Sequence, residues 1–306
     1  MSVSETAKQK FGVVAIVGAP NAGKSTFINS IIGEKISIVS SKIQTTRTRV
    51  RGVSIQGDTQ IVFIDTPGIF KPNKKNNLER AIVYAAWESI EDVDQIIFLY
   101  DASKKINDET KALLERLAQQ KNTPIILALN KIDKIDKARL LDLSKELNDL
   151  MDFDASFMIS ALKNDGISRV LEYLEKTLPE GPWHYPEDEI SDMPMRLLSA
   201  EITREKIFES LYQELPYNIT VETDAWENFD NGDIKISQTV YTSRDAHKKI
   251  ILGKGGSNLK KIGMNARQDI EKILNQKTHL KLFVKVQENW MDNEDRFSLW
   301  GLSSKH

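Results

Sequence analysis

The stretch Gly18–Ser25 reads GAPNAGKS and fits the pattern G-x-x-x-x-G-K-[ST]. The apolar run Val13–Val17 before it predicts a buried strand, and apolar positions 27, 28, 31 and 32 after it predict a helix that ends at Gly33. A glycine loop between a strand and a helix turns backbone N–H groups and the positive end of the helix dipole toward phosphate. The sequence therefore predicts a phosphate-binding loop, with a chance glycine turn before a helix as the alternative.

Two segments of the sequence are predicted to hold the phosphates and Mg²⁺. In the loop, Lys24 would reach the β- and γ-phosphates, and the Ser25 hydroxyl would coordinate Mg²⁺. After the strand-like run Ile61–Ile64, Asp65 is placed to hold Mg²⁺ directly or through water, and the Gly68 N–H can sense the γ-phosphate. The nucleotide contacts predicted in these segments are Gly18, Ala19, Pro20, Asn21, Ala22, Gly23, Lys24, Ser25, Thr26, Asp65, Thr66, Pro67 and Gly68.

The base is indicated by NKID at Asn130–Asp133, which follows the apolar run Pro124–Leu129. Ligands on open parallel sheets bind at the carboxyl ends of the strands. A carboxylate at Asp133 can accept hydrogen bonds from guanine N1–H and the 2-amino group, which adenine lacks, so the site would reject ATP. Ser160–Lys163 would support the base through its backbone. The predicted base-side contacts are Asn130, Lys131, Asp133, Ser160, Ala161 and Leu162.

Four motifs in this order, each after an apolar strand run, predict a GTP-binding domain. Strand and helix runs alternate through the first half of the chain, which predicts an α/β fold with a doubly wound, mainly parallel sheet. Four prolines and a cluster of acids between Leu178 and Pro194 predict an extended, solvated linker. We expect an N-terminal tail at 1–10, the GTPase domain at 11–180, the linker at 181–194 and a smaller α+β domain at 195–306.

Composition narrows the class of protein. The chain has no cysteine, which excludes disulfides and cysteine-based metal or catalytic sites and suits a cytoplasmic protein. It has no apolar run long enough to span a bilayer and no signal-peptide pattern at its start. The net charge of −2 hides a basic stretch, because residues 245–286 carry ten Lys/Arg against three Asp/Glu, or +7. This stretch predicts a basic face on the second domain.

The centre of the basic stretch is GKGG at Gly253–Gly256, between two helical runs. The expected order of elements from residue 195 is helix, strand, strand, helix, helix, strand, which is the type II KH arrangement. A G-x-x-G loop in this setting lets the backbone approach about four nucleotides of single-stranded RNA; a plain helix-breaking turn is the alternative. The predicted RNA contacts are Lys248, Lys249, Gly253, Lys254, Gly255, Gly256, Lys260 and Lys261, with His247 as a minor contact.

One GTPase domain joined to one type II KH domain resembles the Era-type bacterial ribosome-assembly GTPases of the TrmE-Era-EngA group. Gln44–Arg47 is similar to the first switch segment of that family, Glu214–Tyr217 to the start of its KH strands, and Gly253–Gly256 to its RNA loop. The resemblance covers about residues 10–300. Der-type relatives carry two phosphate loops, and this chain has one.

The resemblance implies the activity and the partners. It implies a GTPase that uses Mg²⁺, binds the 3′ end of small-subunit ribosomal RNA rather than DNA, and assists 30S maturation. It also implies a cytoplasmic protein of a family that is sometimes associated peripherally with the inner membrane. A monomer is the default expectation for the oligomeric state. Catalysis would involve Lys24, Thr46 and Gly68, with Thr46 joining Ser25 and Asp65 on Mg²⁺ and Thr45 as the alternative ligand.

Two residues predict how fast GTP is hydrolysed. Ile69 stands where Ras-like enzymes place the glutamine that orients water, which predicts slow intrinsic hydrolysis. Asn21 occupies the position from which related GTPases hold K⁺ against the phosphates; a role in satisfying loop backbone is the alternative.

Two other classes of protein fit parts of the sequence. A P-loop nucleotide kinase would share the phosphate loop but has no use for NKID. A GTPase switch with a protein or membrane partner would use the KH-like domain as a scaffold, because a Lys-rich face also attracts anionic lipid.

Overall fold

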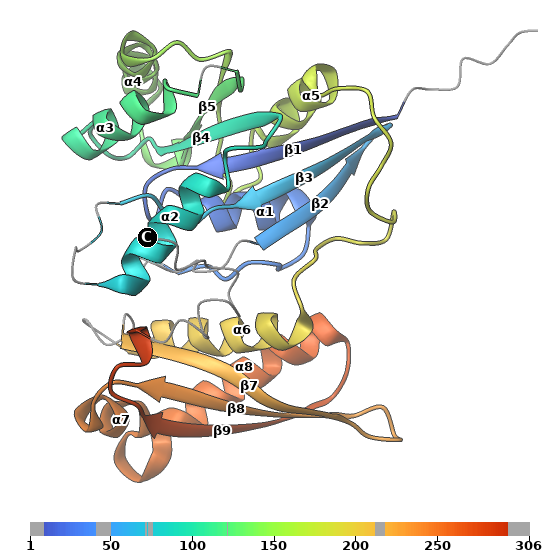
Figure 1. The fold of residues 1–306 in the computed structure, drawn as a ribbon, viewed down its shortest axis with the longest axis vertical. Helices are drawn as coiled ribbons and strands as arrows, with labels where there is room; N and C mark the ends of the chain where they lie inside the picture. The colour runs from blue at the N-terminus through green and yellow to red at the C-terminus, as the bar shows by residue number, and fades with distance from the viewer. Residues whose placement is uncertain are drawn as a thin grey trace, which may run out of the picture.

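A computed structural model of the chain describes residues 9–40, 50–70, 72, 76–120, 122–211 and 218–292 (Figure 1). Strands in these residues form one sheet of six strands and one of three. No helix of this part of the chain is long and apolar enough to cross a membrane.

The six-stranded sheet has the order β2-β3-β1-β4-β5-β6. Only β2 runs antiparallel to its neighbour, and every other pair is parallel. The predicted α/β class with a mainly parallel sheet is therefore confirmed. The strands are β1 Lys10–Val17, β2 Val50–Gln56, β3 Thr59–Asp65, β4 Gln95–Asp101, β5 Ile125–Asn130 and β6 Ala155–Met158.

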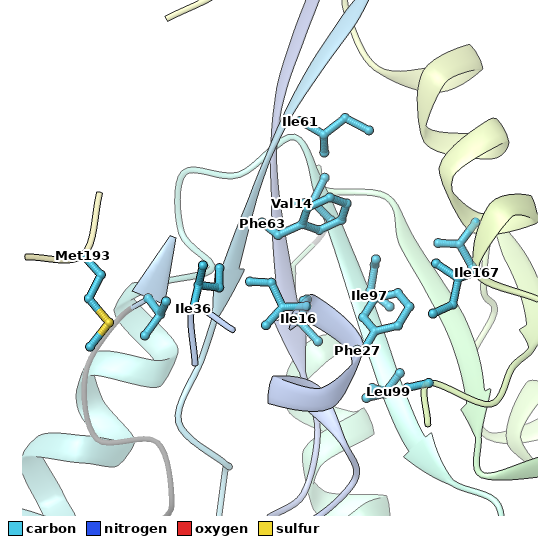
Figure 2. Packing of buried hydrophobic residues seen from close by; sticks show 14 of the residues in the cluster. Val14, Ile16, Phe27, Ile36, Ile61, Phe63, Ile97, Leu99, Ile167 and Met193 are labelled. Atoms are coloured by element: carbon cyan, nitrogen blue, oxygen red, sulfur yellow. The ribbon is translucent and has the colours of Figure 1, made fainter. Parts of the chain in front are cut away.

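Helices cover both faces of this sheet, so its central strands are apolar on both sides. In β1, Val14 and Ile16 belong to the cluster under α1 and α5, which also contains Phe27 of α1; Figure 2 shows Val14 beside Phe63. Ala15 and Val17 belong to the cluster under α2, α3 and α4. The helices are α1 Lys24–Ile32, α2 Asn77–Glu88, α3 Asp108–Leu117, the short η1 Ile132–Lys134, α4 Lys137–Leu150 and α5 Ile167–Thr177.

The three-stranded sheet has the order β7-β8-β9, with β7 and β8 antiparallel and β8 and β9 parallel. Its core joins Ile207 and Phe208 of α6 to Val221 and Val240 of the sheet and to Ile262 of α8. The elements follow the predicted order: α6 Met195–Ser210, β7 Ile219–Asn228, β8 Ile234–Thr242, α7 Asp245–Leu252, η3 Lys254–Gly256, α8 Ser257–Leu274, β9 Thr278–Val286 and η4 Trp290–Asp292.

The segment between the two units is extended, but the prediction that it is solvated is wrong in part. It runs along the edge strand β2, where the Val53 N–H donates to the Ile190 carbonyl at 2.9 Å. The Ser191 hydroxyl donates to the Arg51 carbonyl at 2.8 Å. Met193 is 8 % exposed and joins the core of the first unit. An unpaired sheet edge offers backbone partners, and the linker uses them.

The last described turn, η4, contacts the first unit. Trp290 is 0 % exposed and packs against Leu78, Ile82 and Ala85 of α2. Its Nε1–H donates to the Asn218 carbonyl at 3.3 Å. A tryptophan contributes a large apolar surface that favours burial, and Trp290 packs against a helix of the other unit. Trp300 lies outside the described residues.

We expect Trp290→Ala to weaken the contact between η4 and α2 strongly. Removing a fully buried tryptophan leaves a cavity and costs about 3–5 kcal/mol. Amide exchange in α2 and the thermal midpoint measure the effect. The control is Tyr84→Ala, an exposed aromatic of the same helix, which should shift stability by ~0.5 kcal/mol or less. Equal protection of α2 in the two variants would contradict the role of Trp290.

Candidate functional site

The sequence motifs converge at the carboxyl edge of the six-stranded sheet. The chain leaves β1 for strands on one side and later continues with β4 on the other. The end of β1 is therefore a topological switch point, where open α/β sheets bind ligands. The loops after β1, β3, β5 and β6 carry the four predicted motifs.

The loop between β1 and α1 is built around a buried ammonium group. Lys24 is 6 % exposed, and its Nζ donates to the carbonyls of Gly18 and Ala19, both at 3.0 Å. Burial lowers the pKa of Lys24 to about 8, although the charge of Asp65 acts in the opposite direction. Gly23 has φ 102°, and a Cβ there would lie 2.3 Å from the Asn130 amide nitrogen. This position therefore requires glycine.

Oxygen donors gather beside this loop. The hydroxyls of Ser25 and Ser37 each donate to Oδ2 of Asp65 at 2.8 Å, and Asp65 is 0 % exposed. Hydroxyl and carboxylate oxygens are the ligands that Mg²⁺ prefers, usually with phosphate oxygens and water completing its shell. The donors present therefore fit this metal. Within the described ranges, no three Asp, Glu, His or Cys side chains form a metal cluster of their own.

Ser37 was not predicted, because no motif covers it. Thr46 and the alternative Thr45 lie outside the described residues. So do Lys71 and residues 73–75 of the expected second switch. Within the described part of that switch, the Ile69 N–H donates to the Gly18 carbonyl at 3.2 Å. A Cβ at Gly68 would lie 2.8 Å from Pro20. Gly68 therefore lies directly against the phosphate loop, and contact of its N–H with a γ-phosphate stays a prediction.

The side chain of Asn130 connects the motifs at the base side. Its Nδ2 donates to the Ala22 carbonyl at 2.8 Å. Its Oδ1 accepts the N–H of Lys131 at 2.8 Å and that of Ala161 at 3.0 Å. The phosphate loop, the NKID turn and the segment after β6 are thus held by one carboxamide, which is 2 % exposed.

Asp133 and Lys131 lie on either side of this carboxamide. Asp133 Oδ1 accepts the Ser160 hydroxyl at 2.6 Å, and this hydrogen bond lowers the pKa of Asp133. The carboxylate therefore stays ionised at neutral pH. Lys131 Nζ donates to the Asn21 carbonyl at 2.6 Å, which joins NKID to the phosphate loop a second time.

Asp101 contacts a predicted nucleotide-binding residue, and the sequence motifs miss it. Its Oδ2 accepts Lys131 Nζ at 2.7 Å, and its Oδ1 accepts the Ser103 N–H at 3.0 Å. Burial alone would raise the pKa of Asp101, but the hydrogen bonds from Lys131 and Ser103 outweigh it and lower the pKa. A signal was present in the sequence, because Asp101 ends a strand as Asp65 and Asn130 do.

The predicted RNA loop lies between α7 and α8. Gly253, Gly255 and Gly256 have φ of 70°, 61° and 80°. A Cβ at Gly255 or Gly256 would meet nothing within 4 Å, so a ligand can approach the backbone there. The Asn258 amide donates to the Ile250 carbonyl at 3.0 Å and closes the loop. Of the predicted contacts, Lys248 is half-buried, and the exposed lysines are Lys249, Lys254, Lys260 and Lys261.

Burial lowers the pKa of His247, next to this loop, and the charge of Arg244 adds to the effect. His247 is therefore mainly neutral at neutral pH. A neutral imidazole would offer RNA a hydrogen bond but no charge, and the predicted minor contact of His247 with RNA stays a prediction.

Comparisons with known proteins agree with both halves of this description. A family described as 50S ribosome-binding GTPase matches residues 13–131, and the KH domain family matches residues 214–291. The chain is 52 % identical to GTPase Era of Rhizobium meliloti (strain 1021) over 291 residues, which are 95 % of this chain and 92 % of the relative.

Two solved structures share the whole architecture. A single-residue variant of Aquifex aeolicus Era bound to GDP·AlF4⁻ is 39 % identical, with a TM-score of 0.92 over 96 % of this chain and 100 % of that one. A structure of Era with MgGDPNP and nucleotides 1506–1542 of 16S ribosomal RNA has the same identity and TM-score, over 96 % of this chain and 99 % of that one. The chain therefore belongs to the Era family of GTPases.

Proposed function

We propose that this GTPase binds the single-stranded 3′ end of small-subunit (16S) ribosomal RNA and assists maturation of the 30S subunit. GTP binding is supported above all by the hydrogen bonds of the Asn130 carboxamide, which join the motifs for phosphate and base at one edge of the sheet. The relative bound to MgGDPNP and to a 16S fragment supports both ligands. A switch with a protein or membrane partner is not favoured.

The base-side residues would select guanine. The Asp133 carboxylate, ionised and fixed by Ser160, would accept the guanine N1–H and 2-amino hydrogens. Asn130 and Lys131 would hold the loops that enclose the nucleotide. The backbone at Ala161 would support the base.

The phosphate side would combine charge with backbone donors. Lys24 and the N–H groups at the start of α1 would bind the phosphates. Ser25, Asp65 and Thr46 would hold Mg²⁺, which neutralises charge on the phosphate oxygens when it is bound. The Gly68 N–H would respond to the γ-phosphate. Ile69 cannot orient water, so we expect slow hydrolysis without a partner.

K⁺ at Asn21 remains a proposal beside the alternative backbone role. Asn21 has a φ of 63°, in the left-handed region, and its carbonyl accepts Lys131. The loop geometry therefore supports a structural role for this residue, and the K⁺ role rests on resemblance alone.

The second domain would bind RNA through the loop at Gly253–Gly256. The open backbone at Gly255 and Gly256 and the exposed lysines around it support contact with phosphates of a single strand. We propose the domain limits 11–180 and 195–306, with 181–194 as the linker. Action in the cytoplasm, on the 30S particle and peripherally at the inner membrane, is proposed on family resemblance, and a monomer is the default expectation.

We expect the variant Asp133→Asn to prefer xanthine nucleotides, whereas the wild type prefers guanine nucleotides. An amide at this position offers an N–H to the C2 carbonyl of xanthine and no longer accepts two guanine hydrogens. Loss of charge-assisted hydrogen bonds should weaken GDP binding roughly 100-fold. Competition between GDP and XDP for the wild-type and variant proteins measures the ratio. An unchanged ratio would remove Asp133 from the base site.

The affinity for GDP should fall as the pH rises above about 8, the pKa of buried Lys24. Below that pH the ammonium group is charged before the phosphates arrive. Above it, binding must take up a proton, and affinity should fall by up to ~10-fold per pH unit. Titration of GDP binding over this range measures the slope.

The control for this pH effect is Lys24→Arg, whose guanidinium stays charged. Deprotonation of guanine at high pH affects both proteins alike. Identical pH profiles of the two proteins would therefore contradict a titrating Lys24.

Lys254→Asp tests the RNA half of the proposed function. In the protein loaded with a GTP analogue, the variant should bind an RNA of the small-subunit 3′ end at least ~10-fold more weakly, and its affinity should depend less on salt. Nucleotide affinity should not change. The control is Lys272→Asp, an exposed lysine near the other end of α8. Equal RNA affinity of the two variants would contradict binding at the GKGG loop.

A further inference from the structure

Residues 35–39, which follow α1, are held firmly on the side of the nucleotide site. The Asn29 carboxamide accepts the N–H groups of Ile36 and Ser37, both at 3.0 Å, and donates to the Ser37 carbonyl at 2.7 Å. The Ser37 hydroxyl, in a residue 2 % exposed, donates to Asp65 Oδ2 at 2.8 Å. The middle of segment 35–39 therefore contacts the carboxylate proposed to hold Mg²⁺.

The opposite side of segment 35–39 is held by the second domain. Glu205 of α6 has a side chain that is 3 % exposed. Its Oε1 accepts the Val39 N–H at 2.8 Å, and its Oε2 pairs with the Lys35 ammonium. One carboxylate thus fixes both ends of the segment, and Ser37 lies midway between them.

Glu205 is itself fixed by a charge network that reaches α8. Lys206 Nζ lies 3.4 Å from Glu205 Oε2 and 2.8 Å from Asp269 Oδ2. Burial would lower the pKa of Lys206, but the hydrogen bond that Lys206 donates to Asp269 and the charge of Glu205 outweigh it and raise the pKa. Lys35 also lies 3.7 Å from Asp269. A buried carboxylate needs such partners, and here they also restrict its position.

Glu205 also lines the same cleft as predicted nucleotide contacts. The cleft has a volume of about 470 Å³ and lies between the two domains. Its walls include Thr26, Ala161 and Leu162 from the nucleotide site, Lys35 and Val39 from segment 35–39, and Glu205. Among these wall residues, Glu205 is the contribution of the second domain.

We propose that Glu205 is a positioning residue of the nucleotide site, supplied by the RNA-binding domain. By fixing residues 35 and 39, it keeps the Ser37 hydroxyl on Asp65 and so orients the carboxylate for Mg²⁺. The inference rests on the proposed metal site. Loss of such an outer partner typically lowers metal affinity 10–100-fold.

The test measures release of a fluorescent GDP analogue from the full chain, in excess Mg²⁺ and in excess EDTA. Mg²⁺ should slow release from the wild type. Glu205→Gln, which keeps the volume but not the charge, should speed release about 10-fold in Mg²⁺ and leave it unchanged in EDTA. The control is Glu209→Gln in the same helix, whose more exposed carboxylate also contacts Lys206, at 3.2 Å. It should match the wild type in both conditions.

A second variant separates positioning from general loosening. Ser37→Ala should reproduce the Mg²⁺-specific effect of Glu205→Gln, and the double variant should release GDP no faster than Ser37→Ala alone, because both act through one contact. Equal acceleration by Glu205→Gln in Mg²⁺ and EDTA, or none in either, would overturn the proposal.

Two further outcomes test the proposed role of Glu205 and the metal site on which it rests. If Glu205→Gln does not fold, unchanged release from Ser37→Ala in Mg²⁺ overturns the proposal by itself. A wild type that releases GDP equally fast in Mg²⁺ and EDTA overturns the metal site on which the proposal rests, a failure distinct from that of Glu205.

Discussion

The nucleotide site depends on the three hydrogen bonds of the Asn130 carboxamide. β5 is separated from β1 by β4, so backbone pairing cannot join the NKID turn to the phosphate loop. A side chain must therefore connect the two loops. Asn130 does so, because its Nδ2 donates to the phosphate loop and its Oδ1 accepts from Lys131 and from Ala161. Buried amides are costly to leave unpaired, so the loops that satisfy Asn130 are held in one arrangement. The Lys131 contacts with Asn21 and Asp101 act on the same loops.

The contact between the two domains combines apolar packing with buried charge. Trp290 packs against α2, and Glu205 holds residues at both ends of segment 35–39. Apolar packing is not directional, whereas a buried carboxylate with two donors fixes both distance and orientation. The linker along β2 adds one backbone hydrogen bond, between Val53 and Ile190, and one from the Ser191 hydroxyl. Within the described residues, these contacts hold the second domain or the linker against the GTPase domain at α2, at segment 35–39 and along β2.

The sequence predicts well what depends on local spacing. The strands before each motif and the order of elements in the KH domain follow from apolar periodicity and glycine position, and the structure has them. Ser37 and Glu205 could not be predicted, because each acquires its role from a partner distant in the chain or in the other domain. Trp290 has the buried position that its type favours, but its partner helix depends on domain packing. Asp101 could have been predicted, because it ends a strand of the parallel sheet as Asp65 does.

The position of Glu205, a residue of the RNA-binding domain that contacts the GTPase domain, has a thermodynamic consequence. If Glu205 orients the Mg²⁺ carboxylate as proposed, nucleotide binding must favour the docked arrangement of α6 over any arrangement that withdraws it. Coupling free energies are reciprocal. A ligand whose affinity depends on the position of α6 must therefore change nucleotide affinity by the same factor by which the nucleotide changes the affinity for that ligand. Asp269 links this network to α8, which begins directly after the GKGG loop. Helix α8 therefore connects the proposed RNA contact to Asp269, which reaches Glu205, the proposed positioning residue, through Lys206.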